Sequence, residues 1–293
     1  MPRIAVVTRK GGVGKSEVTV ALAAAFARRH ERTLVVDLDP QANASRRLAA
    51  AWDQESGQPT VSEAIKADTI GVGEDVVVPC GWTDSAGERS KEAEYIDVLP
   101  SRLDLMNRET ETGQVGAIRR LKKALDGWSD DYDWQLYDNR PDLGHLVQMS
   151  MAAADYVLVP CALEFDAIDG AMEVQRFIDE HAEDIFNPTL QLLAVLPTRY
   201  DGRKAEQQFQ YEGLRNHFRD LVLKFGGMAT LSKGDEFFVP PYIPERTRFA
   251  EADSAAASLT AWNDRVGRET TEIYDRLAEA IVARVKQLEE VAA

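Results

Sequence analysis

The sequence has few of the features that mark secreted, metal-clustered or membrane-spanning proteins. Its 293 residues include two cysteines, Cys80 and Cys161, which lie far apart, so we expect neither a disulfide framework nor a cysteine-held metal. No run of about 18 apolar residues occurs, so we expect no membrane span. The chain enters an apolar segment at Ile4, which leaves no room for a signal peptide. These absences favour a protein of the reducing cytoplasm.

Positively charged residues are outnumbered by negatively charged ones. The chain has 34 Lys and Arg against 49 Asp and Glu, a net charge of −15. A protein that binds nucleic acid over its whole surface would usually be basic. Any DNA contact must therefore come from a local basic patch, and it should weaken steeply with salt. We interpret most of the carboxylates as contributing to solubility.

Apolar residues make up 44% of the chain, enough for a sizeable core, and short apolar runs alternate with segments of helical spacing. This alternation predicts an α/β fold with a doubly wound, mainly parallel sheet flanked by helices. We expect one domain over residues 1–293, with a variable polar region at about 53–94. The expected strands cover 4–8, 33–39, 95–99, 134–138, 156–160, 190–196 and part of 237–243. The expected helices cover 18–29, 41–52, 115–125, 167–183, 205–225 and a long C-terminal one at about 260–290.

Residues 10–17 read KGGVGKSE, between the first expected strand and the first expected helix. A strand, a glycine-rich loop and a helix in this order are the context of a phosphate-binding loop. Glycines let backbone N–H groups turn inward, and the helix N-terminus adds partial positive charge. Lys15 could then reach the terminal phosphates, and Ser16 could hold Mg²⁺ through its hydroxyl. The alternative is a glycine-rich turn with an incidental lysine.

Acidic residues stand at the ends of two expected strands. Asp37 and Asp39 close the strand at 33–39, and Asp138 closes the one at 134–138. Ligands of open parallel sheets sit beyond the carboxyl ends of the strands, so these acids should lie beside the glycine loop. One of Asp37 and Asp39 could instead serve only to cap the helix that follows Pro40.

Together these motifs resemble those of the ParA family of partition ATPases, within the deviant-Walker class of P-loop proteins. Residues 10–16, KGGVGKS, resemble the family's KGGVGKT, and residues 37–43, DLDPQAN, resemble its DxDPQxN. Weaker similarities lie at 99–105, 138–144, 154–160, 200–203 and 243–248. The resemblance covers most of the chain and implies ATP and Mg²⁺ as cofactors.

The resemblance also implies residue roles. Lys10 matches the family's signature lysine, which reaches across a nucleotide-sandwich dimer to the partner's phosphates, and Lys15 matches the P-loop lysine. Asp39 matches the aspartate that positions the attacking water; with Lys10 and Lys15 it forms the expected catalytic set. The expected Mg²⁺ set is Ser16, Asp39 and Asp138, the last acting through water. The expected nucleotide contacts are Lys10, Gly11, Gly12, Val13, Gly14, Lys15, Ser16, Glu17, Thr198, Arg199, Pro244, Glu245 and Arg246.

Two local departures from the family pattern concern this site. Glu17 replaces the usual threonine after Ser16, and its carboxylate would repel the α-phosphate unless it turned outward or paired with a cation. We expect it to point to solvent. Asn139 and Arg140 replace Thr-Pro after Asp138, which adds a charge near the site. The polar stretch from Asp53 to Glu94 is also richer than the family minimum, and we expect these departures to bear on the hydrolysis rate and the cargo more than on the fold.

The function implied by the resemblance is an ATP-dependent homodimer that binds DNA without sequence preference and partitions a plasmid or chromosome locus. A ParB-like adaptor would stimulate weak intrinsic hydrolysis, and the protein would be cytoplasmic and nucleoid-associated. The expected DNA contacts are Arg265, Arg268, Arg203 and Lys204, because arginine and lysine neutralise phosphates without reading sequence. The alternative for Arg265 and Arg268 is a solvated helix face with partners four residues apart, such as Asp264 with Arg268 and Glu272 with Arg276.

The sequence also has to be weighed against four alternative functions. A related ATPase could position a cargo other than DNA, such as a protein assembly. A MinD-like membrane-surface ATPase would need a basic, bulky amphipathic C-terminus, whereas residues 286–293 are acidic and small. An iron–sulfur carrier is disfavoured by the two separated cysteines. A nucleotide switch without turnover stays open because of Glu17 and Arg140, and an assay of phosphate release would distinguish it.

Overall fold

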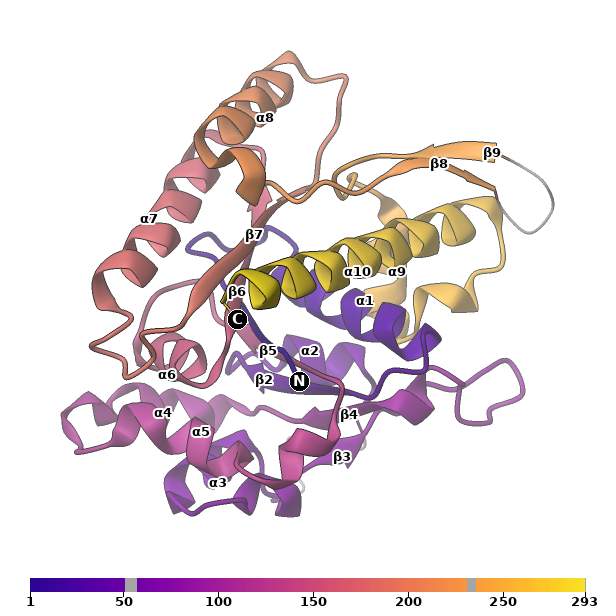
Figure 1. Cartoon of the computed structure of the whole chain (residues 1–293). Coiled ribbons are helices and arrows are strands. Elements are labelled where there is room, and N and C mark those ends of the chain that lie inside the picture. The colour runs from indigo at the N-terminus through magenta and orange to yellow at the C-terminus, as the bar shows by residue number, and fades with distance from the viewer. Residues whose placement is uncertain (51–56, 231–235, 293) are drawn as a thin grey trace.

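A seven-stranded sheet forms the centre of the molecule (Figure 1). The computed structural model describes residues 1–50, 57–230 and 236–292. The strand order is β3-β4-β2-β5-β1-β6-β7, and every neighbouring pair is parallel except β3 with β4. The strands are β1 Arg3–Val6, β2 Thr33–Leu38, β3 Val78–Pro79, β4 Ile96–Leu99, β5 Trp134–Asn139, β6 Tyr156–Ala162 and β7 Gln191–Thr198. The expected doubly wound, mainly parallel sheet is confirmed.

Helices cover both faces of this sheet and bury two separate apolar clusters against it. One face carries α1 Lys15–Arg28, α2 Asn43–Arg47, α9 Thr247–Ala255 and α10 Arg265–Ala292. The other face carries α3 Val61–Ala67, α5 Arg120–Leu125, α6 His145–Ala153, α7 Phe165–His181 and α8 Ala205–Phe218. The short α4, Met106–Glu109, lies beside α6.

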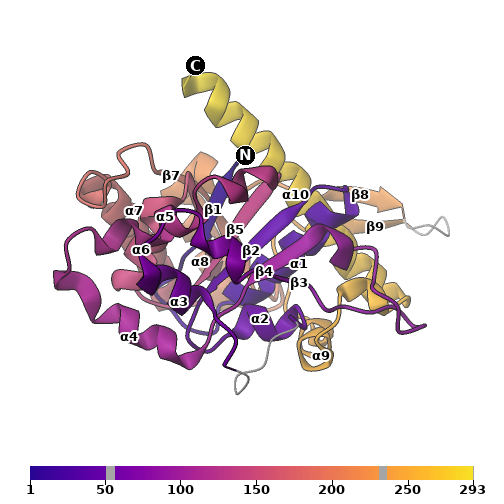
Figure 2. The same cartoon turned by 90° about the horizontal axis from the view of Figure 1, so that it is seen from below.

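The central strands β2, β5 and β6 are buried on both faces, which explains the apolar runs in β2 and β6. Phe26 of α1 stacks on Trp134 of β5 with the ring centroids 4.3 Å apart. Helix α10 packs on α1 through a buried stripe that includes Ile273, Tyr274 and Leu277. Its C-terminal end extends beyond the body of the molecule (Figure 2). Within the described ranges, no helix is long and apolar enough to cross a membrane.

Several element boundaries differ from those expected. The C-terminal helix begins at Arg265 rather than near 260, because residues Leu259–Ala261 form a separate 3-10 turn. The helix expected at 205–225 ends at Phe218, since Arg219 takes a positive φ of 45°. The helix expected at 115–125 is α5 preceded by a 3-10 turn, Ala117–Arg119. In place of a helix over 41–52 there is the five-residue α2; residues 51–52 lie outside the described part.

The polar region and the segment before α9 contain elements that the sequence analysis did not specify, a helix in the first and a second strand in the other. In the polar region at 53–94, of which 53–56 lie outside the described residues, α3 begins with a capping box between Thr60 and Glu63. The expected strand within 237–243 is β9, Glu236–Val239. It pairs antiparallel with an unexpected strand, β8 Gly227–Thr230, in a hairpin apart from the main sheet.

Candidate functional site

The glycine loop joins the end of β1 to the start of α1 at the carboxyl edge of the sheet. Gly12 and Gly14 have φ values of 77° and 90°, a region that side chains with a Cβ rarely adopt. These turns bring the loop to the N-terminus of α1, where free N–H groups favour an anion. A cavity of about 410 Å³ opens over the loop. The predicted strand–loop–helix context of a phosphate site is therefore present.

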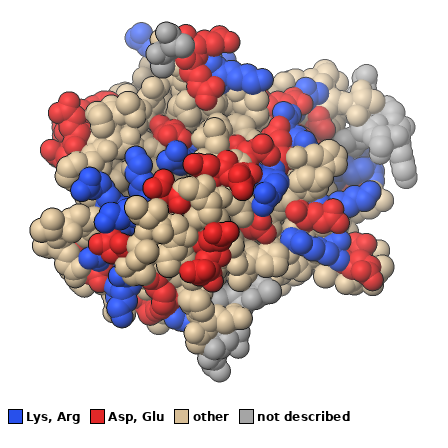
Figure 3. Space-filling model, turned by 60° about the horizontal axis from the view of Figure 1, so that its bottom comes forward, with Lys and Arg blue, Asp and Glu red and all other residues tan. Residues whose placement is uncertain are grey.

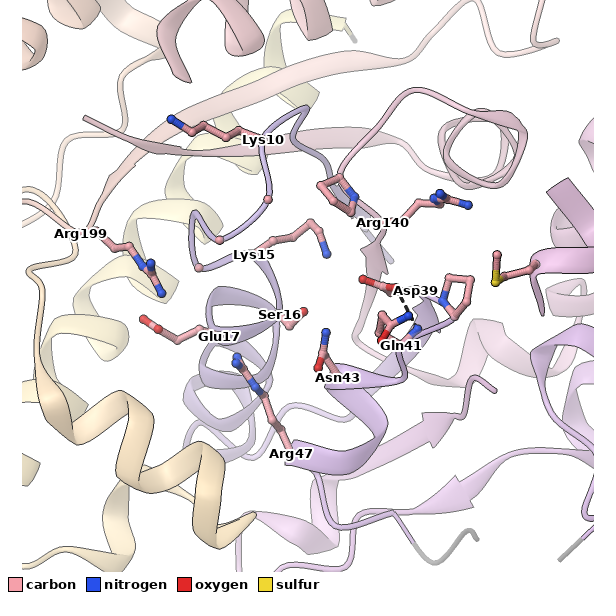
Figure 4. Close-up of a pocket in the computed structure, with 16 residues that line it drawn as sticks. Lys10, Lys15, Ser16, Glu17, Asp39, Gln41, Asn43, Arg47, Arg140 and Arg199 are labelled. Carbon is pink, nitrogen blue, oxygen red and sulfur yellow. Dashed lines mark hydrogen bonds between the residues drawn. The ribbon is translucent and has the colours of Figure 1, made fainter. Parts of the chain in front are cut away.

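The two lysines of the loop point in different directions. Lys15 is buried, and its Nζ lies 3.2 Å from Oδ1 of Asp138 at the end of β5. Lys10 extends to the opposite side of the loop, away from Lys15 (Figure 4). Its Nζ lies 2.5 Å from Oε2 of the exposed Glu164, and this cation lowers the pKa of the Glu164 carboxyl. Both lysines line the cavity, but Lys15 is directed inward to the end of β5 and Lys10 outward to an exposed acid.

Three carboxylates meet behind the loop, as the ends of their strands predict. Asp37 and Asp138 are register partners on β2 and β5, and both are fully buried. Burial, with the nearby Asp138 charge, raises the pKa of Asp37 to about 7. Asp37 accepts hydrogen bonds from the backbone N–H and the hydroxyl of Ser45 in α2, both at 2.8 Å, so it caps that helix. Asp39 instead lines the cavity, and burial raises its pKa.

The residues present suit a magnesium ion bound mainly through phosphates and water. Ser16 lines the cavity beside Lys15. Asp138 accepts the Thr19 hydroxyl at 3.2 Å on Oδ1, while its buried Oδ2 has no hydrogen-bond partner among the described residues. No group of three or more His, Cys, Asp or Glu side chains in the described part could hold a metal alone. Mg²⁺ in phosphate sites commonly keeps several waters and takes few protein ligands, which matches this arrangement.

Glu17 does not point to solvent, contrary to our expectation. Its side chain turns into the cavity region toward Arg199, and Arg47 approaches it from α2 (Figure 4). The hydroxyl of the buried Tyr274, on α10, donates to Oε1 of Glu17 at 3.1 Å. Burial raises the pKa of Glu17 to about 7, although Arg47, the Tyr274 hydrogen bond and Arg199 act in the opposite direction. Inside the site, the carboxylate therefore has one hydrogen bond from Tyr274 and two nearby cations, Arg47 and Arg199.

A second cavity of about 300 Å³ adjoins the first and shares Glu17, Arg47 and Arg199 with it. The expected nucleoside residues Pro244, Glu245 and Arg246 line this second cavity. In contrast, Thr198 and Val13 line neither cavity.

Thr198 supports the loop from the side of β7. Its buried hydroxyl donates to the carbonyl oxygen of Val13 at 2.7 Å. This bond connects the end of β7 to the glycine loop. In this structure the two residues therefore stabilise the position of the loop. The remaining expected nucleotide contacts, Lys10, Gly11, Gly12, Gly14, Lys15, Ser16, Glu17 and Arg199, line the first cavity.

The residues that replace Thr-Pro also have definite positions. Arg140 lines the cavity and forms an ion pair with Asp142, with Glu109 at 3.8 Å. Asn139 is buried and donates from Nδ2 to the carbonyl oxygens of Val6 and Tyr137, both at 3.1 Å. The charge of Arg140 is thus balanced by neighbouring acids.

Sequence reasoning missed some residues of the cavity. Gln41 and Asn43 line it, and their place in the DxDPQxN-like motif could have indicated this. Arg47 also lines it, and it forms a two-point ion pair with Asp253 of α9 at 2.7 and 3.0 Å. Asn43 and Arg47 are four residues apart on α2, so they share a helix face, which was the available signal for Arg47.

The four expected DNA-contacting cations already have partners. Arg265 pairs with Glu269 at 2.8 Å. The Arg268 guanidinium donates to the carbonyl oxygen of Asn263 at 2.7 Å, while the Asp264 carboxylate pairs with Arg248. Arg203 pairs with Asp201, and Lys204 with Glu245. Of the i,i+4 pairs considered, that of Glu272 with Arg276 is present at 3.1 Å. On the face in Figure 3, Lys and Arg are likewise interspersed with Asp and Glu.

Comparison with known proteins agrees with this geometry. A family model described as an AAA domain matches residues 1–192. The chain is 32% identical to the chromosome-partitioning ATPase Soj of Thermus thermophilus, with 97% of each chain covered. It is 30% identical to the chromosome partitioning protein ParA of Caulobacter vibrioides, covering 99% of this chain and 97% of that protein. This chain belongs to the ParA/Soj family. It is accordingly a P-loop ATPase, with ATP and Mg²⁺ as its cofactors.

Solved structures support the fold of this ParA/Soj-family member. Cobyrinic acid a,c-diamide synthase of Mycobacterium smegmatis with bound ADP and magnesium has a TM-score of 0.73 at 25% identity, covering 98% of this chain and 96% of that one. Apo McdA of Cyanothece has a TM-score of 0.74 at 18% identity, covering 96% and 99%. A plasmid partition protein of Borrelia burgdorferi has a TM-score of 0.69 at 19% identity, covering 97% and 98%.

Proposed function

We propose that this ATPase forms an ATP-dependent sandwich dimer, binds DNA without sequence preference and drives partition of a plasmid or chromosome locus. The observation that carries the proposal is the divergence of the two loop lysines. Lys15 points inward to Asp138, beside the proposed phosphate position of its own subunit, whereas Lys10 points away from Lys15 toward the exposed Glu164. If a second subunit packed against this surface, Lys10 could contact the phosphates of the nucleotide bound to that second subunit.

Within that dimer each site residue has a proposed role. Lys15 holds the terminal phosphates, and Lys10 from the partner stabilises charge that develops on the transferred phosphoryl group. Ser16 ligates Mg²⁺, and Asp138 and Asp39 support it through water. Asp39 also orients the attacking water, since it lines the cavity while Asp37 is occupied in capping α2. The backbone of residues 11–14 surrounds the phosphates.

DNA binding is proposed for the basic residues near the start of α10 and after β7, namely Arg265, Arg268, Arg203 and Lys204. Three of these side chains pair with carboxylates, so DNA phosphates would have to displace protein acids at those positions. This supports weak, strongly salt-dependent binding that becomes effective when a dimer doubles the contacts. The protein would thus be cytoplasmic and nucleoid-associated, and a ParB-like adaptor would stimulate hydrolysis and release.

The dimer can be tested by light scattering after size exclusion, with a slowly hydrolysed ATP analogue and Mg²⁺ or with ADP. We expect a dimer with the ATP analogue only. Lys10→Ala should keep analogue binding on the monomer while weakening the dimer by about tenfold or more, because a desolvated charge contact across the interface is lost. Arg9→Ala is the matched control, since Arg9 precedes Lys10 and pairs with Glu173. A fully dimeric Lys10→Ala protein with normal hydrolysis would contradict the proposal.

A further inference from the structure

Glu17 occupies the junction of the two cavities. It follows Ser16 in the first turn of α1, and it is one of three residues that line both the cavity over the glycine loop and the cavity at Pro244–Arg246. The other two are Arg47 and Arg199. A nucleotide with its terminal phosphates on the loop and its base toward residue 244 must pass its α-phosphate and ribose across this junction. Glu17 therefore faces the middle of the nucleotide.

The carboxylate is fixed in this position. Tyr274 is completely buried within the packing of α10 on α1, so its hydroxyl is a fixed donor to Oε1 of Glu17. This contact occupies Oε1, and Oε2 accepts no hydrogen bond from the described residues, so it can accept one from a ligand in the cavities that Glu17 lines. Arg47 is itself held in place by the two-point pair with Asp253, so two of the side chains around Glu17, Tyr274 and Arg47, are fixed by burial or by pairing.

The chemistry of the nucleotide decides what such an acceptor can contact. A carboxylate repels the α-phosphate, and Arg47 and Arg199 beside it are the groups suited to that phosphate. At the junction the ribose hydroxyls are the nucleotide's hydrogen-bond donors. A site built around an acceptor for a hydroxyl discriminates strongly against an analogue that lacks it, because the acceptor is then left unpaired.

We propose that Glu17 accepts a hydrogen bond from a ribose hydroxyl of the bound nucleotide, so that this ATPase selects ribonucleotides over deoxyribonucleotides. The inference rests on ATP binding at the glycine loop, and it is independent of dimer formation and of DNA binding. Tyr274 is in this arrangement a positioning residue, which acts through Glu17. The same contact would link nucleotide occupancy to α10, the helix that carries Arg265 and Arg268 at its start.

The test is calorimetric titration of the full chain with ATP, 2′-deoxy-ATP and 3′-deoxy-ATP, each with Mg²⁺ and under conditions without turnover. We expect at least one deoxy analogue to bind the wild-type protein about tenfold to hundredfold more weakly than ATP, the range expected for one hydrogen bond to a charged group. In Glu17→Ala this ratio should fall to about one, with binding of the deoxy analogue kept or improved because a repulsive carboxylate is gone.

Two further variants separate positioning from general effects. Tyr274→Phe removes the donor but keeps the ring, so the ratio should fall part of the way. Glu251→Ala removes an exposed carboxylate on α9 that lines neither cavity, so the ratio should stay at the wild-type value. Equal binding of all three nucleotides to the wild-type protein, or an unchanged ratio in Glu17→Ala, would overturn the ribose contact while leaving the ATP site intact. Absence of any nucleotide binding would overturn both.

Discussion

Replacing Lys15 by methionine would leave a carboxylate buried at the head of the glycine loop without its cation. The side chains of Lys15 and Asp138 are 8% and 0% exposed, and their charged atoms are 3.2 Å apart. After the change, Asp138 would keep one described hydrogen bond, from the Thr19 hydroxyl, and would still face the buried Asp37 across the sheet. Removing one partner of a buried pair typically costs about 3–5 kcal/mol, because the remaining charge is uncompensated.

The measurement is urea unfolding of the nucleotide-free protein. Lys15→Met should lower the free energy of unfolding by about 3–5 kcal/mol, a large part of the roughly 5–15 kcal/mol usual for a folded protein. In Lys15→Met/Asp138→Asn the buried group is a neutral amide, so the double variant should be less destabilised than the sum of the two single variants by about 2 kcal/mol. Lys204→Met is the control. Its exposed pair with Glu245 should contribute less than about 1 kcal/mol.

If the effects of Lys15→Met and Asp138→Asn add within about 0.5 kcal/mol, the two residues do not interact in the nucleotide-free protein. The head of the loop would then be held by other contacts, such as its glycine turns and the bond from Thr198 to Val13. All Lys15 variants should also lose ATP binding, which calorimetry would report separately from stability.

Three further changes give distinct results. Asp39→Ala should keep ATP binding and the dimer but slow phosphate release by about a hundredfold or more, since a water-positioning group is lost; loss of affinity instead would show that its role is misassigned. Arg265→Glu with Arg268→Glu should lower DNA affinity and reduce the slope of log K against log salt by about one per lost phosphate contact, measured by fluorescence anisotropy, and an unchanged slope would move the DNA surface elsewhere. Gly14→Ala should cost about 1–2 kcal/mol of stability in urea, because a Cβ is strained at a φ of 90°, and no loss would argue against this loop conformation.

The sheet could be predicted from the sequence because its signals are local and strong. β6 is apolar throughout and β2 carries a Leu-Val-Val run, while all residues of β2, β5 and β6 are buried, so the pattern and the packing largely agree. The acids at the strand ends followed from the same logic, since Asp37 and Asp138 are paired in register. The hairpin of β8 and β9 was harder to predict, because its four-residue strands lie outside the main sheet and β8 contains only two apolar side chains, those of Met228 and Ala229.

Residue positions that depend on distant segments could not be predicted in this way. The sequence showed that Arg140 adds a charge near the site but did not identify its partner; its acids include Glu109, which lies 31 positions earlier and comes from α4. Thr198 was expected to contact the nucleotide, yet its hydroxyl bonds Val13, which lies 185 positions away. In each case the motif correctly placed the residue near the site. Its bonding partner depended on how separate helices and strands pack together, which the motif does not show.

Glu17 shows why such a side chain can turn inward where local electrostatics predicts the opposite. Judged beside the glycine loop alone, a carboxylate should avoid the phosphate position. Its surroundings come from α2, from the end of β7 and from α10, which supply Arg47, Arg199 and the Tyr274 hydroxyl. Two nearby cations and one buried donor offset part of the cost of placing a carboxylate there, and burial still raises the pKa of Glu17 to about 7. A chain that keeps a carboxylate at this cost needs an attractive contact for it once the nucleotide is bound, and the ribose is the part of ATP that can provide one.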